Sequence, residues 1–582
     1  MIIEKLKDYY ERMASNPESG IAPYGWAWRG IPFIIVITKT GEFMDIEDTR
    51  IDDGKKKKAR MFLAPQPFKK SSNIVSNLLW ESPEYVLGVG SKNLDKKKDA
   101  FRQMVKQFSD TNSTIIALLK FLDSPTRENM KKHPLYEELI EEGSIISFRI
   151  DGSKKLIFEA TEVKKTIENY FEETDVQAEE IIDMITGEQD RLALKHPLIK
   201  GLPGGQSFGV NLVSFNPPSF RSWGNVMGHN APMGKHTAFA YVTALNTLLA
   251  NGSGQKISIG DTTILFWSEK ETKLEKVLAS LFVDSVNGES NITVVDSIRS
   301  VLSYIQAGGK EEKDETFYVL GLLANTARVA VKFWQEGTVE ELCANIRQYL
   351  NDVSITKSPR DPEHFSLRYL FLDLTETGKS DAVNPKIAGD TLEAIFGGTL
   401  FPTTLLNMII NRIKSDVKYR VNSKRASLLK AFLNRYFKIY PNPKFEEIGM
   451  ELNNESKIIS YQLGRLFATF EKIQEEGMSS NNSLREQFYN SASAAPGTTF
   501  PILIKKSIYH LTKIKSGGRK IFFEKILQEI MVIIQEMGGF PKHHNLYEQG
   551  YFALGYFQQR QRFFTKTAKE DDSGGEETVA TE

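Results

Sequence analysis

The chain has 582 residues, which is enough for more than one domain, and its 74 lysine and arginine residues balance 74 aspartate and glutamate residues. Overall charge therefore indicates no class of partner. The single cysteine, Cys343, excludes an intramolecular disulfide and a cysteine-based zinc site.

The first segment, "MIIEKLKDYYERM", is charged from residue 4 onward and has no apolar signal-peptide core. The apolar runs "IPFIIVIT" and "TIIALLKFL" are far shorter than the roughly 20 residues that a membrane helix needs. We therefore expect a cytoplasmic protein.

Strands are expected mainly in the first two thirds of the chain. Residues 31–48 predict two strands joined at Lys39-Thr40-Gly41, and residues 143–159 predict a hairpin that turns at Asp151-Gly152. Residues 316–337 predict a further strand pair around a turn near Asn325, followed by helical spacing. Residues 175–192 predict a helix, with Gly187 as a possible break.

From about residue 400 the strand signals largely stop and helical periodicity takes over. Leu405, Ile409, Ile413 and Val417 fall on one stripe, as apolar residues of an amphipathic helix do. Further helices are predicted near 424–440, 457–476, 499–514, 519–536 and 547–566. The pattern indicates an α+β fold: a mixed α/β region with hairpins over 1–398, an all-α helical bundle over 399–567, and an acidic, disordered tail over 568–582.

The last predicted helix is rich in aromatic and polar residues. At 100° per residue, Phe552, Tyr556 and Phe563 cluster on one side, while Tyr551, Gln558 and Arg562 share the opposite stripe with Gly555. One face is expected to pack, and the other is expected to be flat, polar and cationic, with a ring available for stacking. The alternative is an ordinary amphipathic helix with solvated amides. Arg560 falls within the aromatic arc and needs either to snorkel or to find a buried partner.

Enzyme motifs are weak. "TETGKS" (375–380) lacks the glycine that a phosphate-binding loop needs five places before Gly378, because that residue is Asp373. The adjacent pair His543-His544 lacks the i, i+4 spacing of a helical metal site, although a metal-dependent nuclease using these histidines remains an alternative. His229 and His236 have no matched nucleophile and acid in the sequence around them.

Two segments suit nucleic acid. Residues 55–71 contain seven basic residues and no acid, and small polar residues follow the second lysine pair. Lysines hold phosphates, and short hydroxyl or amide side chains reach base edges. The alternative is a solvated lysine-rich loop. The glycine-rich segment 201–220 permits close backbone approach, and Gln206, Ser207 and Asn211 are able to hydrogen-bond to a strand, although a plain surface loop is equally consistent with its chemistry.

Several segments together resemble the large subunit of type I-C CRISPR Cascade complexes, the Dvulg-type family. They are "YYERMASNPESGIAPYGWAWRGIPFIIVI", "GKKKKARMFLAPQPFKKSSNIVSNLLWESPEYVLGV", "LVSFNPPSFRSWGNVMGHNAPMGKHTAFAYVTALNTLL", "FYVLGLLANTARVAVKFW", "YQLGRLFATFEKIQ" and "EQGYFALGYFQQRQRFF". The likeness extends from the first residues to about Lys566, with the segments in family order.

The resemblance implies a non-catalytic subunit, without a cofactor, of an RNA-guided surveillance complex. Such a subunit recognises the protospacer-adjacent motif on duplex DNA, assists opening and holds the displaced strand. The implied partners are the guide RNA complex, target DNA, the backbone and RNA-processing subunits, and a recruited helicase–nuclease. The resemblance also implies a small-subunit-like helical module, with Met450 as the expected internal start of a free copy.

Site residues carry over less directly. Motif recognition maps onto 69–77, with Ser72 and Asn73 first for base edges; the full set is Lys69, Lys70, Ser71, Ser72, Asn73 and Asn77. Expected backbone or strand contacts are Lys55, Lys56, Lys57, Lys58, Gln206, Ser207, Asn211, Arg412, Lys418, Arg425, Arg465, Gln558 and Arg562. The family pattern has a proline at Ser76, an aromatic at Leu78 and Ser-Pro at Leu323-Ala324, so the loop shape and the motif preference stay open.

Overall fold

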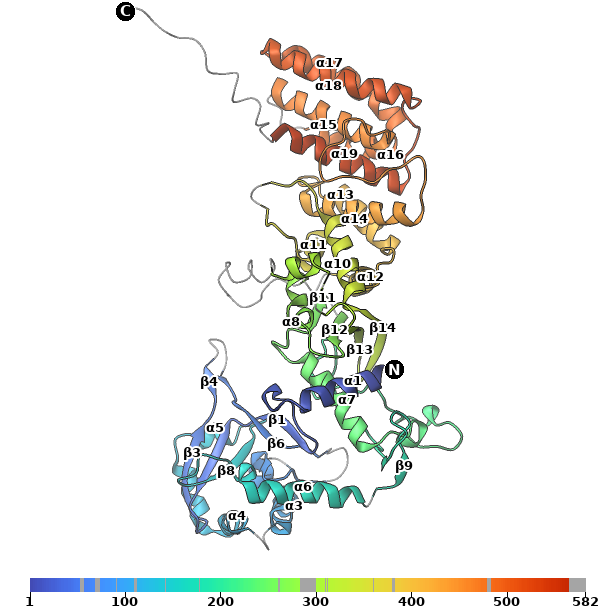
Figure 1. Ribbon diagram of the computed structural model, residues 1–582. Helices are drawn as coiled ribbons and strands as arrows, with labels where there is room; N and C mark the ends of the chain where they lie inside the picture. Colours follow the sequence, from blue (N-terminus) through green and yellow to red (C-terminus); the bar gives the residue numbers. More distant parts are fainter. Residues whose placement is uncertain are drawn as a thin grey trace, which may run out of the picture. The chain divides into compact units, whose positions relative to one another are not determined.

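The chain folds into two compact units. The computed structural model describes residues 1–52, 57–68, 74–90, 92–108, 112–141, 143–176, 178–259, 262–282, 300–308, 310, 312–358, 361–378, 383–478 and 483–564 (Figure 1). Unit 1 comprises residues 1–199 and 213–247, and unit 2 comprises residues 200–212 and 248–582. The acidic segment 568–582 lies outside the described residues.

Unit 1 is built on a four-stranded sheet of order β3-β2-β8-β7. The central strand β2 (Phe33–Ile37) is buried along its whole length; it pairs antiparallel with β3 (Phe43–Asp48) and parallel with β8 (Ile146–Ile150). Such a continuous apolar strand is typical of a sheet covered on both faces. The last strand, β7 (Trp80–Glu81), is short and completes this edge of the sheet.

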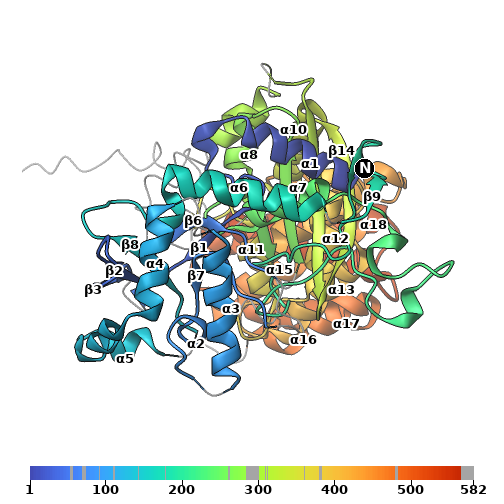
Figure 2. The same ribbon diagram turned by 90° about the horizontal axis from the view of Figure 1, so that it is seen from below.

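Unit 1 contains further helices, strands and 3-10 turns, and Figure 2 shows them from below. They are α1 (Ile2–Ala14), β1 (Trp26–Gly30), β4 (Ile51–Asp52), β5 (Lys57–Lys58), β6 (Met61–Pro65), α2 (Pro83–Val86), α3 (Leu94–Gln107), α4 (Ser113–Asp123), α5 (Tyr136–Leu139), α6 (Thr161–Val176), β9 (Glu180–Ile182), β10 (Gln189–Arg191) and α7 (Lys235–Leu249), with 3-10 turns at η1 (Pro17–Ser19), η3 (Pro125–Lys132), η4 (Ile157–Glu159), η5 (Pro218–Phe220) and η6 (Met227–Asn230).

Unit 2 joins an antiparallel sheet to a stack of helices. The sheet has the order β11-β12-β13-β14. Its elements are β11 (Lys256–Ile259), β12 (Thr262–Ser268), α8 (Lys273–Val277), η7 (Leu278–Leu281), β13 (Thr316–Asn325), β14 (Arg328–Thr338), α10 (Val339–Val353), α11 (Leu367–Leu374), α12 (Pro385–Gly397), α13 (Thr403–Ser415), α14 (Ser423–Ile439), α15 (Ile459–Gly477), α16 (Leu484–Ala494), α17 (Pro496–Lys513), α18 (Gly517–Glu536) and α19 (Leu546–Phe564).

The mixed α and β composition of the fold is confirmed, with a helical C-terminal part. One hydrophobic core runs from Ile257 in β11 to Phe557 in α19, so the sheet and the helices of unit 2 share it. The division into compact units therefore differs from the boundary at 398/399 that the loss of strand signals predicts. Every helix in the described part of the chain is too short or too polar to span a bilayer.

Two local predictions are confirmed, one is confirmed in part and one is wrong. The hairpins β2–β3 and β13–β14 form with turns where the sequence places them. In 143–159 the strand β8 and the turn at Asp151-Gly152 form, but the second strand is reduced to a single antiparallel bridge between Arg149 and Leu156, and a 3-10 turn follows. Residues 175–192 form the β9–β10 hairpin instead of a continuous helix. The carboxylate of Asp183 builds its turn by accepting the backbone N–H of Ile185 at 2.6 Å.

Candidate nucleic-acid interface

Segment 69–73, which carries the expected base-reading residues, lies outside the described residues, but both of its flanks are described. On one side, the ring of Phe68 packs 6.2 Å from Phe171 and 6.5 Å from Tyr170, both in α6. On the other side, the side-chain Oδ1 of Asn77 accepts the backbone N–H of Phe68 at 2.9 Å. The two ends of the segment are therefore joined directly.

The Asn77 side of this connection is fixed by a buried carboxylate. Glu81 is 2% exposed, and its two oxygens accept the backbone N–H groups of Asn77 at 3.1 Å and Ser82 at 2.8 Å. Asn77 itself is 4% exposed. Hydrogen bonds to a buried carboxylate are stronger than neutral ones. The Asn77 side chain therefore joins the two flanks of the loop. Its buried position does not suit the expected contact with a DNA base.

The loop flanks rest on strands β6 and β7. The indole Nε1 of Trp80 donates to the carbonyl of Pro65 at 2.9 Å, and the guanidinium of Arg29 lies 4.8 Å above the Trp80 ring. Burial lowers the pKa of Arg29 from its ordinary value, while the nearby Glu81 carboxylate acts in the opposite direction. We call residues 66–82 the anchored loop.

The lysine group before the anchored loop is partly described. Lys55 and Lys56 lie outside the described residues, whereas Lys57 and Lys58 form strand β5 and are exposed. The Lys57 ammonium lies 4.0 Å from the Asp48 carboxylate. A solvated pair of this kind contributes little to stability, so Lys57 remains suitable for phosphate.

The glycine-rich segment packs against its own unit. Gln206 and Ser207 are exposed, and Asn211 forms a bridge with Arg328 at the β13–β14 turn. The Asn211 N–H donates to the carbonyl of Ala327 at 3.0 Å. A Cβ on Gly205 would lie 2.8 Å from Val210, so this glycine serves close packing within the loop.

Two of the expected cationic contacts are interior residues. Arg425 is 2% exposed and donates to the carboxylates of Asp373 and Asp416, each at 2.8 Å. Arg465 is also 2% exposed, and its guanidinium bonds to Asn454, Gln462 and Gln559. The expectation of strand contacts is wrong for both side chains in this fold, because a guanidinium that is desolvated and hydrogen-bonded inside the core does not reach phosphate.

Arg412, Lys418 and Arg562 differ in accessibility. Arg412 is half-buried and lies 3.7 Å from Asp416. Lys418 is exposed beside the ring of Tyr419, and Arg562 is exposed near the end of α19. Lys418 and Arg562 therefore stay available as strand contacts.

The expected open face of α19 is wrong. Residues 549–559 are all buried, including Tyr551, Gly555 and Gln558. The Gln558 Oε1 accepts the hydroxyl of Tyr461 at 2.5 Å, and its Nε2 donates to the carbonyls of Gly449 and Met450. Of the two alternatives for Arg560, the structure shows the buried partner: its guanidinium lies 3.3 Å from the buried Glu471 and 2.7 Å from Glu475. A helix buried all round is a core element.

Sequence reasoning missed the exposed cationic side of α17. Lys505, Lys506 and Lys513 are exposed there, and Tyr509 is 54% exposed. No acid occurs between Gln487 and Phe523. That acid-free stretch is the signal that identifies this face from the sequence, because an uncompensated row of lysines attracts phosphates.

The histidines do not form a common site. His544 is buried, with Nδ1 3.0 Å from the carbonyl of Ser493, whereas its neighbour His543 is exposed. His229 pairs with Glu179 at 2.8 Å, and His236 pairs with Asp190 at 3.1 Å. Within the described ranges, no group of three or more His, Cys, Asp or Glu side chains is arranged to hold a metal ion.

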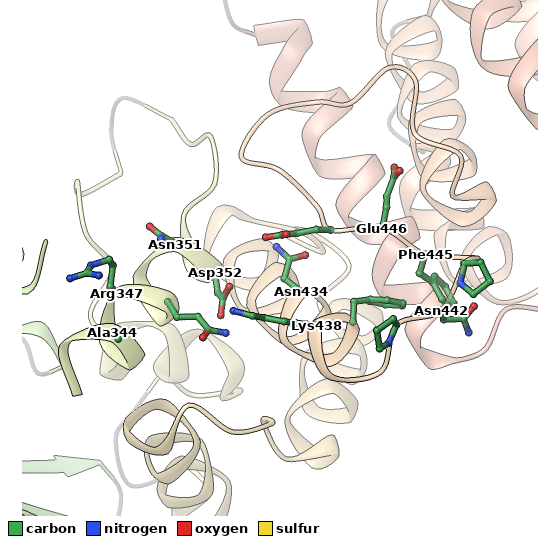
Figure 3. A pocket seen from close by; sticks show the side chains of 14 residues that line it. Ala344, Arg347, Asn351, Asp352, Asn434, Lys438, Asn442, Phe445 and Glu446 are labelled. Carbon is green, nitrogen blue, oxygen red and sulfur yellow. The ribbon is translucent and has the colours of Figure 1, made fainter. Parts of the chain in front are cut away.

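A cavity of about 760 Å³ opens in unit 2 between α10, α14 and the connection that follows α14 (Figure 3). Its wall carries the cations Arg347 and Lys438 together with the carboxyl groups of Asp352 and Glu446. Asp352 is held by Arg435 at 3.1 Å. The mixed charges give this cavity no preference for a polyanion.

A model of the family described as CRISPR-associated protein (Cas_Csd1) matches residues 6–564. The match spans nearly the whole chain, so the chain belongs to this family, as the sequence resemblance indicates. A search of the curated proteins found no match.

Proposed function

We propose that this member of the Cas_Csd1 family is the large subunit of a type I-C Cascade complex, which recognises a protospacer-adjacent motif on target DNA. It then assists duplex opening and holds the displaced strand for a recruited helicase–nuclease, with no chemistry of its own. Pairing with the guide RNA identifies the target in such complexes, so the protein needs one short base-reading segment and phosphate-binding surfaces.

The observation that carries this proposal is the anchored loop. Asn77 and Glu81 join the two ends of a segment that contains Lys69, Lys70, Ser72 and Asn73. Fixing both ends reduces the conformational entropy that the segment loses when it engages DNA. Lysines at the entry and small polar side chains at the centre suit phosphate and base edges respectively.

The α17 face supports the second part of the proposal. Its lysines and the exposed ring of Tyr509 are the combination that binds single strands: cations along the backbone and an aromatic surface for bases. We assign the displaced strand to this face, in place of the buried residues of α19.

The helical block after Met450 also suits a free small subunit. Its first segment is held by the block itself, since Arg465 bonds to Asn454 and Gln558 bonds to the carbonyl of Met450. Without the preceding helices, the block loses the packing of Tyr547 against Tyr436, whose ring centroids lie 4.5 Å apart. A free copy therefore has an exposed aromatic face for docking.

The test is binding of the assembled complex to duplexes with varied flanking motifs at fixed salt. In the double variant Ser72→Ala, Asn73→Ala we expect loss of discrimination with general affinity kept, since each base-edge contact contributes about 1–3 kcal/mol of discrimination. The matched pair Lys69→Ala, Lys70→Ala keeps discrimination, and its salt slope falls by about 0.9 per lost phosphate contact. If the Ser72→Ala, Asn73→Ala variant still discriminates between motifs, other residues recognise the motif, and Gln206 and Ser207 are the next candidates.

The alternative of a metal-dependent nuclease predicts metal-dependent DNA cleavage by the isolated protein that His543→Ala with His544→Ala abolishes. The unequal burial of the two imidazoles gives that alternative no support.

A further inference from the structure

The loop over residues 217–230 in unit 1 presents a tryptophan to solvent. It contains the 3-10 turns η5 and η6 and precedes α7, and its green ribbon projects from the β9 and α7 region in both views (Figures 1 and 2). Trp223, between the two turns, is 98% exposed. We call residues 217–230 the Trp223 loop.

The tip of the Trp223 loop has an unfavourable backbone. Trp223 has φ = 54° and Met227 has φ = 48°, and Gly224 between them has φ = 78°. A bulky residue in the left-handed region is strained, and such strain persists only where the surroundings impose it. An indole in that conformation with almost no contact surface contributes nothing evident to folding.

The base of the loop imposes this shape. The Asn230 side chain accepts the N–H of Ser222 and donates to the carbonyl of Met227, each at 3.0 Å. A Cβ on Gly228 would lie 2.4 Å from the carbonyl of Ala193, so the loop sits directly on the preceding strand connection. The His229 ring closes the base through Glu179 at 2.8 Å. These contacts at the base therefore fix the conformation of the loop that exposes the Trp223 ring.

The segment that carries the ring is free of acidic residues. Residues 191–260 contain no aspartate or glutamate, and the exposed Arg221 stands two positions before Trp223. The acids at the loop base are engaged: Glu179 pairs with His229, and Asp190 pairs with His236. An exposed aromatic ring close in sequence to an exposed cation suits a base followed by a phosphate.

We propose that Trp223 stacks on an unpaired base of the nucleic acid that the complex holds, with Arg221 on the adjoining phosphate. This inference rests on the proposed function, because it requires a complex that binds nucleic acid with unpaired bases. It adds a contact on unit 1 that is separate in sequence from the anchored loop and from α17. A protein partner is the competing occupant, because Phe220, Val226 and Met227 of the same loop are also 37–40% exposed, and the assembly arm of the test below distinguishes it.

The test uses the assembled complex with wild-type chain, Trp223→Ala, Trp223→Phe and the control Val226→Ala, a 40% exposed apolar residue of the same loop. The probes are a target duplex and the same sequence with a pre-opened bubble, with single 2-aminopurine substitutions scanned along both strands. Stacking on an aromatic ring contributes about 1–3 kcal/mol per base, so Trp223→Ala is expected to bind both DNAs roughly tenfold more weakly. Trp223→Phe and Val226→Ala retain most of the affinity.

A 2-aminopurine whose fluorescence changes between wild type and Trp223→Ala identifies the stacked position. Unchanged affinity and unchanged fluorescence at every position overturn the inference, and so does failure of Trp223→Ala to assemble with the other subunits, which indicates a protein contact. Motif discrimination separates the two proposals: Trp223→Ala keeps it if the anchored loop recognises the motif. If Trp223→Ala lowers the affinity while the Ser72→Ala, Asn73→Ala variant keeps motif discrimination, stacking by Trp223 is supported and motif recognition by the anchored loop is rejected.

Discussion

Helices α17 and α19 belong to the same helical block and contain similar kinds of side chain, but their surroundings are opposite. Both combine aromatic, aliphatic and basic residues, and α19 also contains glutamines. In α19 every residue from Gln549 to Gln559 is buried, whereas α17 exposes Ile508, Tyr509 and three lysines. The composition of a helix therefore does not decide which face meets solvent.

The difference lies in what the neighbouring helix supplies. Helix α15 supplies Tyr461 to Gln558, Arg465 to Gln559 and Glu471 to Tyr556, so these three polar side chains of α19 are paired inside the core. Buried polar groups are tolerated when they are paired in this way. The stretch of sequence that contains α17, residues 487–523, has no acidic residue. The polar side chains of α19 thus have partners on α15, whereas the lysines of α17 are exposed on an acid-free segment.

The largest effect is expected where α15 and α19 cross. A Cβ on Gly555 would lie 2.0 Å from the carbonyl oxygen of Tyr461, and a Cβ on Gly464 would lie 2.0 Å from the carbonyl oxygen of Phe552. Gly555→Ala therefore forces two backbones apart, and we expect a loss of stability of about 3 kcal/mol, seen as a lower unfolding midpoint in calorimetry. Gly517→Ala is the matched control, because its Cβ meets nothing within 4 Å. Equal midpoints for the two variants contradict this account of the crossing.

A smaller effect, on binding and not on folding, is expected from α17. The double variant Lys505→Glu, Lys506→Glu is predicted to weaken binding of opened DNA about tenfold. Its salt slope should fall by about 0.7 for each lost single-strand phosphate contact. Its unfolding midpoint stays close to that of wild type, because both side chains are exposed.

The controls for α17 come from the core and from another surface. Gln558→Met, inside α19, is expected to lower the unfolding midpoint and leave the salt slope unchanged. Lys444→Glu, at an exposed lysine outside α17, is expected to change neither. Equal losses of affinity for Lys444→Glu and the α17 variant indicate a nonspecific charge effect and remove the case for this face.

The sequence predicts local structure well where the signal is local. The alternation in 316–337 and the turn near Asn325 suffice for β13–β14. It predicts poorly where a distant residue decides the structure: the carboxylate of Asp183 that shapes the β9–β10 turn also accepts the N–H of Gly234, 51 positions away. The helical spacing of residues 175–192 gives no indication of this contact with Gly234.

The candidate site shows the same division. The basic character of the anchored loop can be predicted from the sequence. The structural role of Asn77 cannot, because it depends on hydrogen bonds with Phe68 and with the buried Glu81. Arg425 and Arg465 resemble surface cations in the sequence, and only the fold shows the carboxyl, amide and carbonyl groups that surround them. A count of basic residues measures the charge of a segment and not its accessibility.

The smallest expected effect is a pH dependence at the start of α19. Burial lowers the pKa of His544 below its ordinary value of 6.5, although the Ser493 carbonyl and Glu548 act in the opposite direction. The unfolded chain takes up a proton near pH 6.5 and the native chain does not, so the free energy of unfolding falls as the pH falls from about 6.5 toward the lowered native pKa. Because the Ser493 carbonyl 3.0 Å away accepts a hydrogen bond, Nδ1 is the nitrogen that carries the proton of the neutral ring.

His544→Gln should therefore be less stable than wild type by about 1 kcal/mol at pH 7.5, where the hydrogen bond to Ser493 is lost. That difference should shrink as the pH is lowered from 6.5 to 5, because the variant has no imidazole to protonate on unfolding. His543→Gln, at the exposed neighbour, is the control and should follow the wild-type profile throughout. Unfolding midpoints measured across this pH range test the point. Parallel profiles for wild type and His544→Gln would show that the imidazole titrates alike in both states, which is incompatible with its burial under α19.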